Sequence, residues 1–420
     1  MYVLPGLNMD NIIAKRLSFF IKNERLAQNL AVRILAKDCN ISPSYLSDLE
    51  NCKCELNEAI IKTIFSELDI DFNLEEQIFK YNNIKQDFDS FLNCVYFQDN
   101  EKAEDKFQKY LANQYNKFNL YNEELELLQL IYYLSYRKTN KLIRSLVETL
   151  ELKQNLLSIE EQILFLLYKA IYLKNLGEID TARKLLLTIV ANVEDKKVIS
   201  LIYYQLGALY SKSNKVALSI KYYLDAKAIF DSNLNYIRSL YVCSNIAVTY
   251  IYSEAFLEAI EACNECIMIA KRLGLNNVIM INAYNLSYIY MRLEQYTEVN
   301  KYVVLALKHG VPDTGIYFHN AYSYLQLNEL SLCEYWTEEG VSKLKENEPL
   351  TKKLYEYLKL RMRNEMEKSI NKLIEIIESN EIDDCFDNQD RRFVIKELFK
   401  LCETTSHSDI ASRYISYLQN

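Results

Sequence analysis

Residues 281–310 read INAYNLSYIYMRLEQYTEVNKYVVLALKHG, and this stretch decides the fold. Its apolar residues recur three to four positions apart on both sides of a short polar interruption, which is typical of two successive amphipathic helices. Ser287 on the first helix is small enough to let the second helix cross closely, and Tyr290 can fill the gap to a neighbouring hairpin. The stretch therefore predicts one helical hairpin.

The same arrangement recurs along the chain. The small residue stands at Ala170, Gly207, Ala247, Ser287 and Ala321, at intervals of 37, 40, 40 and 34 residues. Further small or apolar residues follow in phase on the second helices, at Ala182, Ser219, Ala259, Val299 and Cys333. The pattern is similar to tetratricopeptide repeats, whose period is about 34 residues. Five hairpins in phase predict an α-solenoid, with less regular helix pairs expected at 74–118, 123–157, 350–380 and 386–419.

Composition supports an all-α fold. Gly and Pro together number only 11 of 420 residues, against roughly 12% in average usage, so turn-rich sheets are excluded. Three histidines and the lack of a nucleotide-binding, metalloprotease or hydrolase motif argue against an enzyme. We expect no metal and no cofactor. Ten cysteines without zinc-ribbon spacing, and no signal peptide or long apolar run, predict a cytoplasmic protein without membrane contact.

A second motif lies near the N-terminus. A short helix is expected at 31–38, then a turn at Asn40, then a helix that begins after Ser42 with Pro43 in its first position. Residues 31–51 resemble the helix-turn-helix of phage-repressor-like (XRE) proteins, with Ile41, Leu46 and Leu49 in the core. The sequence thus predicts a helix-turn-helix DNA-binding domain at 1–70 and a tetratricopeptide-like repeat domain at 71–420.

The net charge of −8 confines any DNA contact to a local surface. Residues 15–37 hold six basic side chains and one acidic one, and basic residues supply most affinity for duplex DNA. We expect Arg33 and Lys37 to contact phosphates. The recognition helix offers no arginine, so base contacts would come from Ser42, Ser44, Tyr45 and Ser47. The alternative is a helix-turn-helix kept only as a protein-binding module.

A helix-turn-helix followed by such repeats resembles the RRNPP family of peptide-pheromone receptors, the Rap, Rgg, NprR, PlcR and PrgX group. The resemblance implies a cytosolic homodimer that binds a short linear signalling peptide in the concave face of its repeats. It also implies that the peptide changes how the dimer presents its DNA-binding domains. We expect dimerisation through 350–419, with help from 1–8.

Candidate groove residues follow from the repeat phase. The residue two positions before each small residue is expected to point into the concave surface. These residues are Tyr168, Gln205, Asn245, Asn285 and His319. An Asn there can both donate to and accept from a peptide backbone, and family members use groove asparagines in this way. Side-chain pockets would come from Tyr241, Tyr284, Tyr288 and Tyr322, and Arg292 would meet a peptide carboxylate. Alternatively, the two asparagines bridge adjacent helices.

Three functions stay open at this point. The first is a quorum-sensing transcription regulator that responds to a peptide. The second is a DNA-binding regulator whose repeats bind a partner protein. The third is a Rap-like interaction protein or phosphatase without DNA binding, although Rap-like members carry a helical bundle where residues 31–51 form the helix-turn-helix motif.

Overall fold

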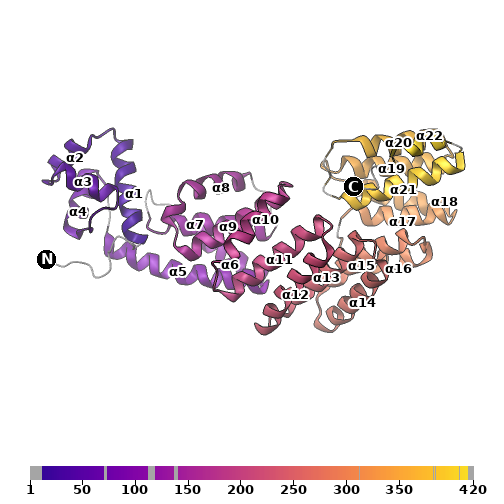
Figure 1. The fold of residues 1–420 in the computed structure, drawn as a ribbon, viewed down its shortest axis with the longest axis horizontal. Helices are drawn as coiled ribbons and strands as arrows, with labels where there is room; N and C mark the ends of the chain where they lie inside the picture. The colour runs from indigo at the N-terminus through magenta and orange to yellow at the C-terminus, as the bar shows by residue number, and fades with distance from the viewer. Residues whose placement is uncertain are drawn as a thin grey trace. The chain divides into compact units, whose positions relative to one another are not determined.

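The computed structural model describes residues 12–70, 73–111, 119–136, 141–311, 313–381, 383, 385–405 and 407–414. In these ranges the chain forms twenty-two α-helices and one 3₁₀ helix, with no strand (Figure 1). The helices belong to two compact units, Met1–Gln205 and Leu206–Asn420. None of the described helices is both long and apolar enough to cross a membrane. The all-α prediction is confirmed.

The N-terminal unit contains two groups of helices. Four short helices come first, at α1 (Ile12–Ala27), α2 (Val32–Asp38), α3 (Pro43–Glu50) and α4 (Glu58–Glu67). Helical hairpins follow, at α5 (Leu74–Phe97), α6 (Asn100–Leu111), α7 (Asn122–Ser135), α8 (Leu142–Leu152), η1 (Gln154–Leu156), α9 (Ile159–Asn175) and α10 (Ile179–Val190). The pairs expected at 74–118 and 123–157 are present, except that 112–118 and 137–140 lie outside the described residues.

The C-terminal unit continues the hairpins. It is entered along α11 (Lys196–Lys212), which both units share, and holds α12 (Val216–Ser232), α13 (Tyr236–Tyr252), α14 (Phe256–Leu273), α15 (Asn276–Arg292), α16 (Tyr296–His309), α17 (Gly315–Gln326), α18 (Leu330–Lys343), α19 (Pro349–Met362), α20 (Met366–Glu378), α21 (Asn388–Thr405) and α22 (Ser408–Tyr414). The odd-numbered members from α13 to α19 are the first helices of successive hairpins. The helix pairs predicted at 350–380 and 386–419 correspond to α19–α20 and α21–α22, except that 406 and 415–419 lie outside the described residues.

The repeat prediction is confirmed in its residues. All five small positions are buried on first helices, and the in-phase positions of the second helices are buried as well. A Cβ atom on Gly207 would lie 2.6 Å from the ring of Tyr223, so a larger residue could not occupy this crossing. Seven residues after each small position, a residue with positive φ turns the chain into the second helix: Gly177, Asn214, Glu254, Glu294 and Asn328. The hairpins therefore share their turn geometry as well as their sequence pattern.

The short helices expected at 31–38 and after Ser42 are present, at Val32–Asp38 and Pro43–Glu50. Asn40 adopts the left-handed conformation with φ 53° between α2 and α3. The hydroxyl oxygen of Ser42 accepts a hydrogen bond from the amide of Tyr45 at 3.1 Å, which caps α3, and Pro43 occupies the first helical turn. Helices α1–α4 belong to the same compact unit as α5–α10, and a domain division at residue 70 stays a prediction.

Candidate functional site

The six residues expected to contact DNA lie on two consecutive helices. Arg33 and Lys37 stand one turn apart on α2, and both are exposed. Ser42 and Ser44 are exposed at the start of α3, whereas Tyr45 and Ser47 are half-buried there. The Tyr45 hydroxyl donates to the carbonyl oxygen of Glu55 at 3.4 Å. Four of the six residues are therefore exposed on two consecutive helices, and their contact with DNA stays a prediction.

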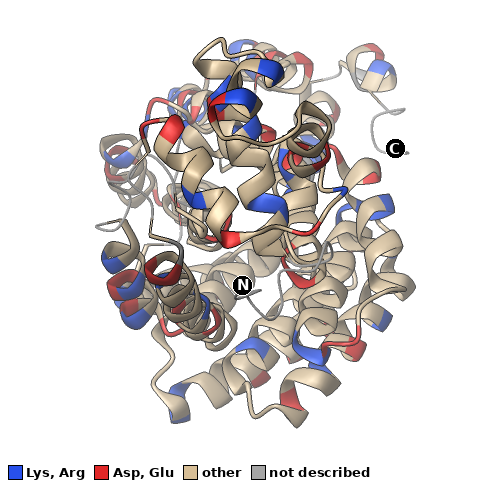
Figure 2. Cartoon of the chain, turned by 90° about the vertical axis from the view of Figure 1, so that its left-hand side faces the viewer, with Lys and Arg blue, Asp and Glu red and all other residues tan. Residues whose placement is uncertain are grey.

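The basic stretch is less basic at its surface than its sequence suggests. Arg25 is buried and pairs with Glu50, with N–O distances of 2.5 and 2.8 Å. Arg16 is also buried in an ion-pair cluster. Neither guanidinium is available to a phosphate. The stretch 15–37 therefore offers two fewer surface cations than its sequence suggests. Figure 2 shows blue basic segments interspersed with red acidic ones on the N-terminal helices that face the viewer.

Arg16 joins α1 to the hairpins that follow. Its guanidinium, 2% exposed, lies 2.6 Å from a carboxylate oxygen of Glu124, 3.4 Å from Glu123 and 3.5 Å from Glu161. It also donates to the carbonyl oxygens of Leu120 and Leu156, at 2.6 and 3.0 Å. One cation therefore meets three glutamates inside the N-terminal unit. Burial raises the pKa of Glu124 to about 8, with a further contribution from the charge of Glu161, although the charge of Arg16 acts in the opposite direction.

This cluster predicts that the stability of the N-terminal unit depends on pH. The folded state holds the Glu124 proton more tightly than the unfolded chain does, because the pKa of Glu124 is near 4.5 when the chain is unfolded. The contribution to the unfolding free energy is therefore greatest below pH 4.5 and is lost as the pH rises to about 8. We expect the unit to melt at a higher temperature at about pH 6 than at about pH 8.5, in circular dichroism of the full chain. The difference should shrink in Glu124→Gln; an unchanged difference in that variant contradicts the assignment.

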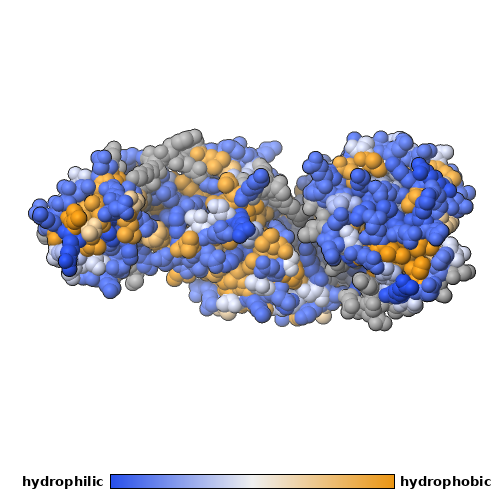
Figure 3. All heavy atoms as spheres, turned by 90° about the horizontal axis from the view of Figure 1, so that it is seen from above, coloured by the Kyte–Doolittle hydropathy of each residue, from blue (hydrophilic) through white to orange (hydrophobic). Residues whose placement is uncertain are grey.

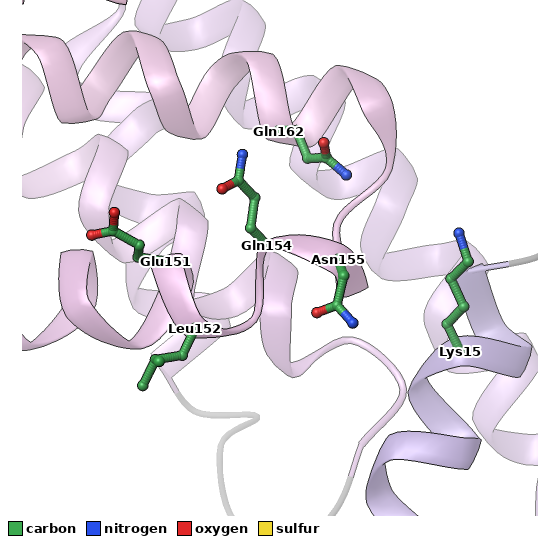
Figure 4. Close-up of a pocket in the computed structure, with 6 residues that line it drawn as sticks. All are labelled: Lys15, Glu151, Leu152, Gln154, Asn155 and Gln162. Carbon is green, nitrogen blue, oxygen red and sulfur yellow. The ribbon is translucent and has the colours of Figure 1, made fainter. Parts of the chain in front are cut away.

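A shallow surface pocket lies beside the cluster (Figure 4). Its volume is about 590 Å³, and its lining combines one lysine with amide and carboxylate side chains from α8, η1 and α9. The lining residues are Lys15, Glu151, Leu152, Gln154, Asn155 and Gln162. None of the residues predicted to bind DNA or peptide lines this pocket.

The residues predicted to line the groove lie on the first helices. Tyr241 and Asn245 belong to α13, Tyr284, Asn285, Tyr288 and Arg292 to α15, and His319 and Tyr322 to α17. Gln205 belongs to α11 in the N-terminal unit, where its side-chain oxygen accepts from Lys174 at 2.6 Å. The C-terminal unit therefore brings eight of the nine predicted residues onto three successive hairpins.

Asn285 has the property that a backbone-reading residue needs. It is 8% exposed, and among the described residues its side-chain nitrogen has no hydrogen-bond partner. Helix bridging, the alternative reading, is instead performed by Asn282, whose side-chain nitrogen donates to Ser244 on α13 at 2.8 Å. Sequence reasoning missed Asn282, although it lies one turn before Asn285. Asn245 is half-buried, and its backbone carbonyl accepts from Thr249 at 2.9 Å.

His319 is a structural member of this surface. Its Nδ1 lies 2.8 Å from the Ser287 hydroxyl, and its ring stacks on Tyr284 at a centroid distance of 5.0 Å. Burial lowers the pKa of His319 to about 3. The imidazole is therefore neutral at physiological pH and carries no charge to a ligand.

Arg292 is already paired. Its guanidinium donates to Glu254 at 2.8 Å and to the Tyr288 hydroxyl at 2.7 Å. The Tyr288 hydroxyl in turn donates to the backbone carbonyl of Gln389 at 3.1 Å. A peptide carboxylate, the expected partner of Arg292, would therefore compete with Glu254 for the guanidinium. Lys396 on α21 contacts both oxygens of the same glutamate, at 2.8 and 2.9 Å.

Helix α21 was not expected at this surface. Tyr322 and Tyr357, from α17 and α19, donate to the two oxygens of buried Glu397 at 2.6 and 2.5 Å. Phe393 packs edge-on against Tyr322 and Phe318, with centroid distances of 5.0 and 6.0 Å. We call the side of α13, α15, α17 and α19 that meets α21 and the chain leading into it the first-helix face. Its tyrosines were predicted as ligand pockets, and part of their surface is covered by the chain itself.

The hairpins and their turns define the class as a tetratricopeptide-like helical repeat protein. A Rap protein complexed with competence and sporulation factor has a TM-score of 0.63, with 14% sequence identity over 81% of this chain and 97% of that one. NprR in complex with its cognate peptide NprX has a TM-score of 0.58, with 16% identity over 80% and 100% of the two chains. The apo form of the quorum sensor NprR from B. thuringiensis has a TM-score of 0.59, with 16% identity over 80% and 98%.

These similarities show a shared fold at low sequence identity. No family model matches the sequence, and no curated protein matches it. The fold expected from the resemblance to peptide-pheromone receptors is therefore confirmed from structure alone. In the described residues, no group of three His, Cys, Asp or Glu side chains is arranged to hold a metal ion.

Proposed function

We propose that this protein is a cytoplasmic, non-enzymatic quorum-sensing regulator that binds duplex DNA through α2 and α3 and a short signalling peptide on the first-helix face. The observation that carries the peptide site is the buried side-chain nitrogen of Asn285, which lies among tyrosines and has no hydrogen-bond partner in the part of the chain that the structure describes. A buried donor without a partner costs free energy, which a ligand carbonyl would recover. The fold shared with NprR in complex with NprX supports a peptide as that ligand.

DNA binding rests on the exposed ends of α2 and α3. Arg33 and Lys37 stand on one face of α2, next to the exposed N-terminus of α3 with Ser42 and Ser44. A recognition helix without arginine needs a second copy to reach specific affinity, so we propose a homodimer that reads two half-sites about one helical turn apart. Footprinting should then reveal a near-palindromic site.

Reversing two charges should weaken DNA binding at every sequence. We expect Arg33→Glu with Lys37→Glu to lower affinity by about tenfold or more and to reduce the slope of log K against log salt by about 2, because two phosphate contacts are lost. Fluorescence anisotropy over a salt series measures both quantities. Lys102→Glu with Lys109→Glu, which reverses two exposed lysines of α6, is the control of equal charge. Equal losses in both double variants contradict the assigned phosphate-contacting face.

The asparagines should carry peptide affinity. Truncating Asn245 or Asn285 to alanine leaves a peptide backbone group unsatisfied, which costs about 1–3 kcal/mol. We expect a roughly five- to 150-fold loss in affinity for a peptide identified by thermal-shift screening, measured by calorimetry. Asn276→Ala is the control, because this exposed residue lies on α15 and pairs with His309. Binding within about twofold of wild type in both variants removes the clamp.

A partner protein is the second candidate, and exposed apolar residues favour it. Leu332 and Tyr335 stand one turn apart on α18 with exposed fractions of 42% and 55%, and Leu330 and Val341 on the same helix are exposed too. The C-terminal unit also shows orange patches on a mainly hydrophilic surface in Figure 3. Such patches serve protein contacts, including homodimer formation. Light scattering with and without DNA measures whether the protein dimerises.

A further inference from the structure

The chain that leads into α21 lies on the first-helix face. The Tyr252 hydroxyl, at the end of α13, donates to the side chain of Asp387 at 2.9 Å. The side-chain nitrogen of Gln389 donates to the carbonyl oxygen of Tyr252 at 3.1 Å, and Tyr288 donates to the carbonyl oxygen of Gln389. The contacts thus use both backbone and side chains of the short segment Cys385–Gln389.

The start of this segment is held by other parts of the same unit. The Cys385 thiol donates to Glu348, at the start of α19, at 3.2 Å, and Phe386 is buried in the apolar core of the unit. A short stretch with one buried aromatic ring, one carboxylate and backbone hydrogen bonds is also what a bound linear peptide presents. The surface that the repeat phase predicts for a peptide is therefore in contact with a peptide-like part of its own chain.

The fit of this segment is incomplete. Two buried polar atoms at this surface have no partner among the described residues: the side-chain nitrogen of Asn285 and the side-chain oxygen of Gln389. Asn285 stands one turn before Tyr288, whose hydroxyl binds the Gln389 carbonyl. Each unsatisfied buried atom costs free energy, so an occupant that also bonds to Asn285 would be favoured over the segment.

We propose that Cys385–Gln389 is a built-in occupant of the first-helix face, which an incoming peptide displaces before it reaches Asn285 and Tyr288. This inference rests on the proposed function and adds its regulation. A tethered segment competes at an effective concentration of about millimolar. The apparent affinity of the free peptide is therefore its intrinsic affinity multiplied by the fraction of molecules in which the face is open. The ion pair between Lys396 and Glu254 holds α21 in register over the face and adds to the closed state.

The test uses a labelled pentapeptide of the segment's own sequence, Ser-Phe-Asp-Asn-Gln, with serine in place of the cysteine. Phe386→Ala with Asp387→Ala weakens the tethered segment and leaves Tyr252, Asn285 and Tyr288 intact. We expect this full-length variant to bind the probe about tenfold tighter than wild type or more, in fluorescence anisotropy. Ser379→Ala with Glu381→Ala is the control, because the Ser379 hydroxyl donates to Glu381 and Glu381 accepts from Lys353. It should bind the probe like wild type.

Affinities of wild type and the Phe386/Asp387 variant within about twofold of each other, or no binding by either, overturn the proposal. Hydrogen exchange on the wild type gives a test without substitutions: saturating probe should speed exchange of the amides in 385–392, and unchanged exchange also overturns it. The thermal-shift screen distinguishes a failure of this proposal from a failure of the proposed function. A peptide found there that binds wild type and the Phe386/Asp387 variant equally keeps peptide sensing and removes self-occupancy.

Discussion

Replacing Arg16 with methionine is expected to destabilise the N-terminal unit by about 3–5 kcal/mol, because it leaves buried carboxylates without their cation. Glu124 and Glu161 are 1% and 3% exposed, and Arg16 is their shared partner. The carbonyl oxygens of Leu120 and Leu156 lose a donor as well. A loss of this size is a large fraction of the roughly 5–15 kcal/mol that stabilises a domain.

Chemical denaturation of the full chain, followed by circular dichroism, measures the effect. Lys15→Met is the matched control, because Lys15 precedes Arg16 on α1 and lines the open pocket. Its expected change is within about 0.5 kcal/mol. Measured at about pH 8.5, above the pKa of about 8 that Glu124 has in the folded state, adding Glu124→Gln to Arg16→Met should restore part of the loss, since one buried charge disappears with its partner. Equal stability of Arg16→Met and Lys15→Met contradicts the role of Arg16 as the joint between α1 and the following hairpins.

Replacing Glu397 with leucine should have an effect of similar size on the C-terminal unit, about 3–5 kcal/mol. Its two carboxylate oxygens accept from Tyr322 and Tyr357, and Arg361 lies 3.3 Å away. Burial raises the pKa of both tyrosines well above its usual range, so both remain protonated donors. Leucine would leave two buried hydroxyl donors without their acceptor, and Arg361 would lose its carboxylate while still donating to the Tyr357 hydroxyl at 2.9 Å.

Glu397→Gln separates the charge from the hydrogen bonds. Glutamine keeps one acceptor oxygen, so we expect a smaller loss than with leucine. Glu403→Leu is the control on the same helix, because Glu403 is exposed. If Glu397→Leu and Glu403→Leu unfold at the same denaturant concentration, the Glu397 contacts do not hold α21 on the first-helix face.

Much of the fold could be predicted because its signals are local. The small residues from Ala170 to Ala321 recur in phase since each hairpin needs one close crossing, and they are buried as expected. The capping hydroxyl of Ser42 and the left-handed Asn40 also depend only on neighbours in the chain. Periodicity, capping and turn chemistry act over a few residues, and these interactions determine where the helices begin, end and cross.

The site could be predicted only in part. The repeat phase placed Asn285 on the first helix of its hairpin, where it is buried, and its contact with a peptide stays a prediction. It could not assign a partner to Arg292, since Glu254 lies in the turn after α13 and Lys396 lies on the distant helix α21. The basic stretch misled for the same reason: Arg16 and Arg25 count as surface charge in the sequence, whereas the fold buries both.

The sequence by itself determined the helices, the repeat and the helix-turn-helix pattern, because each follows from spacing within some forty residues. Only the tertiary structure decided that Arg16 meets Glu124, more than a hundred residues away, and that α21 returns to cover the tyrosines of α15 and α17. Contacts of this kind depend on how successive hairpins stack and curve. Small rotations at each repeat add along the array, and no local pattern records their sum.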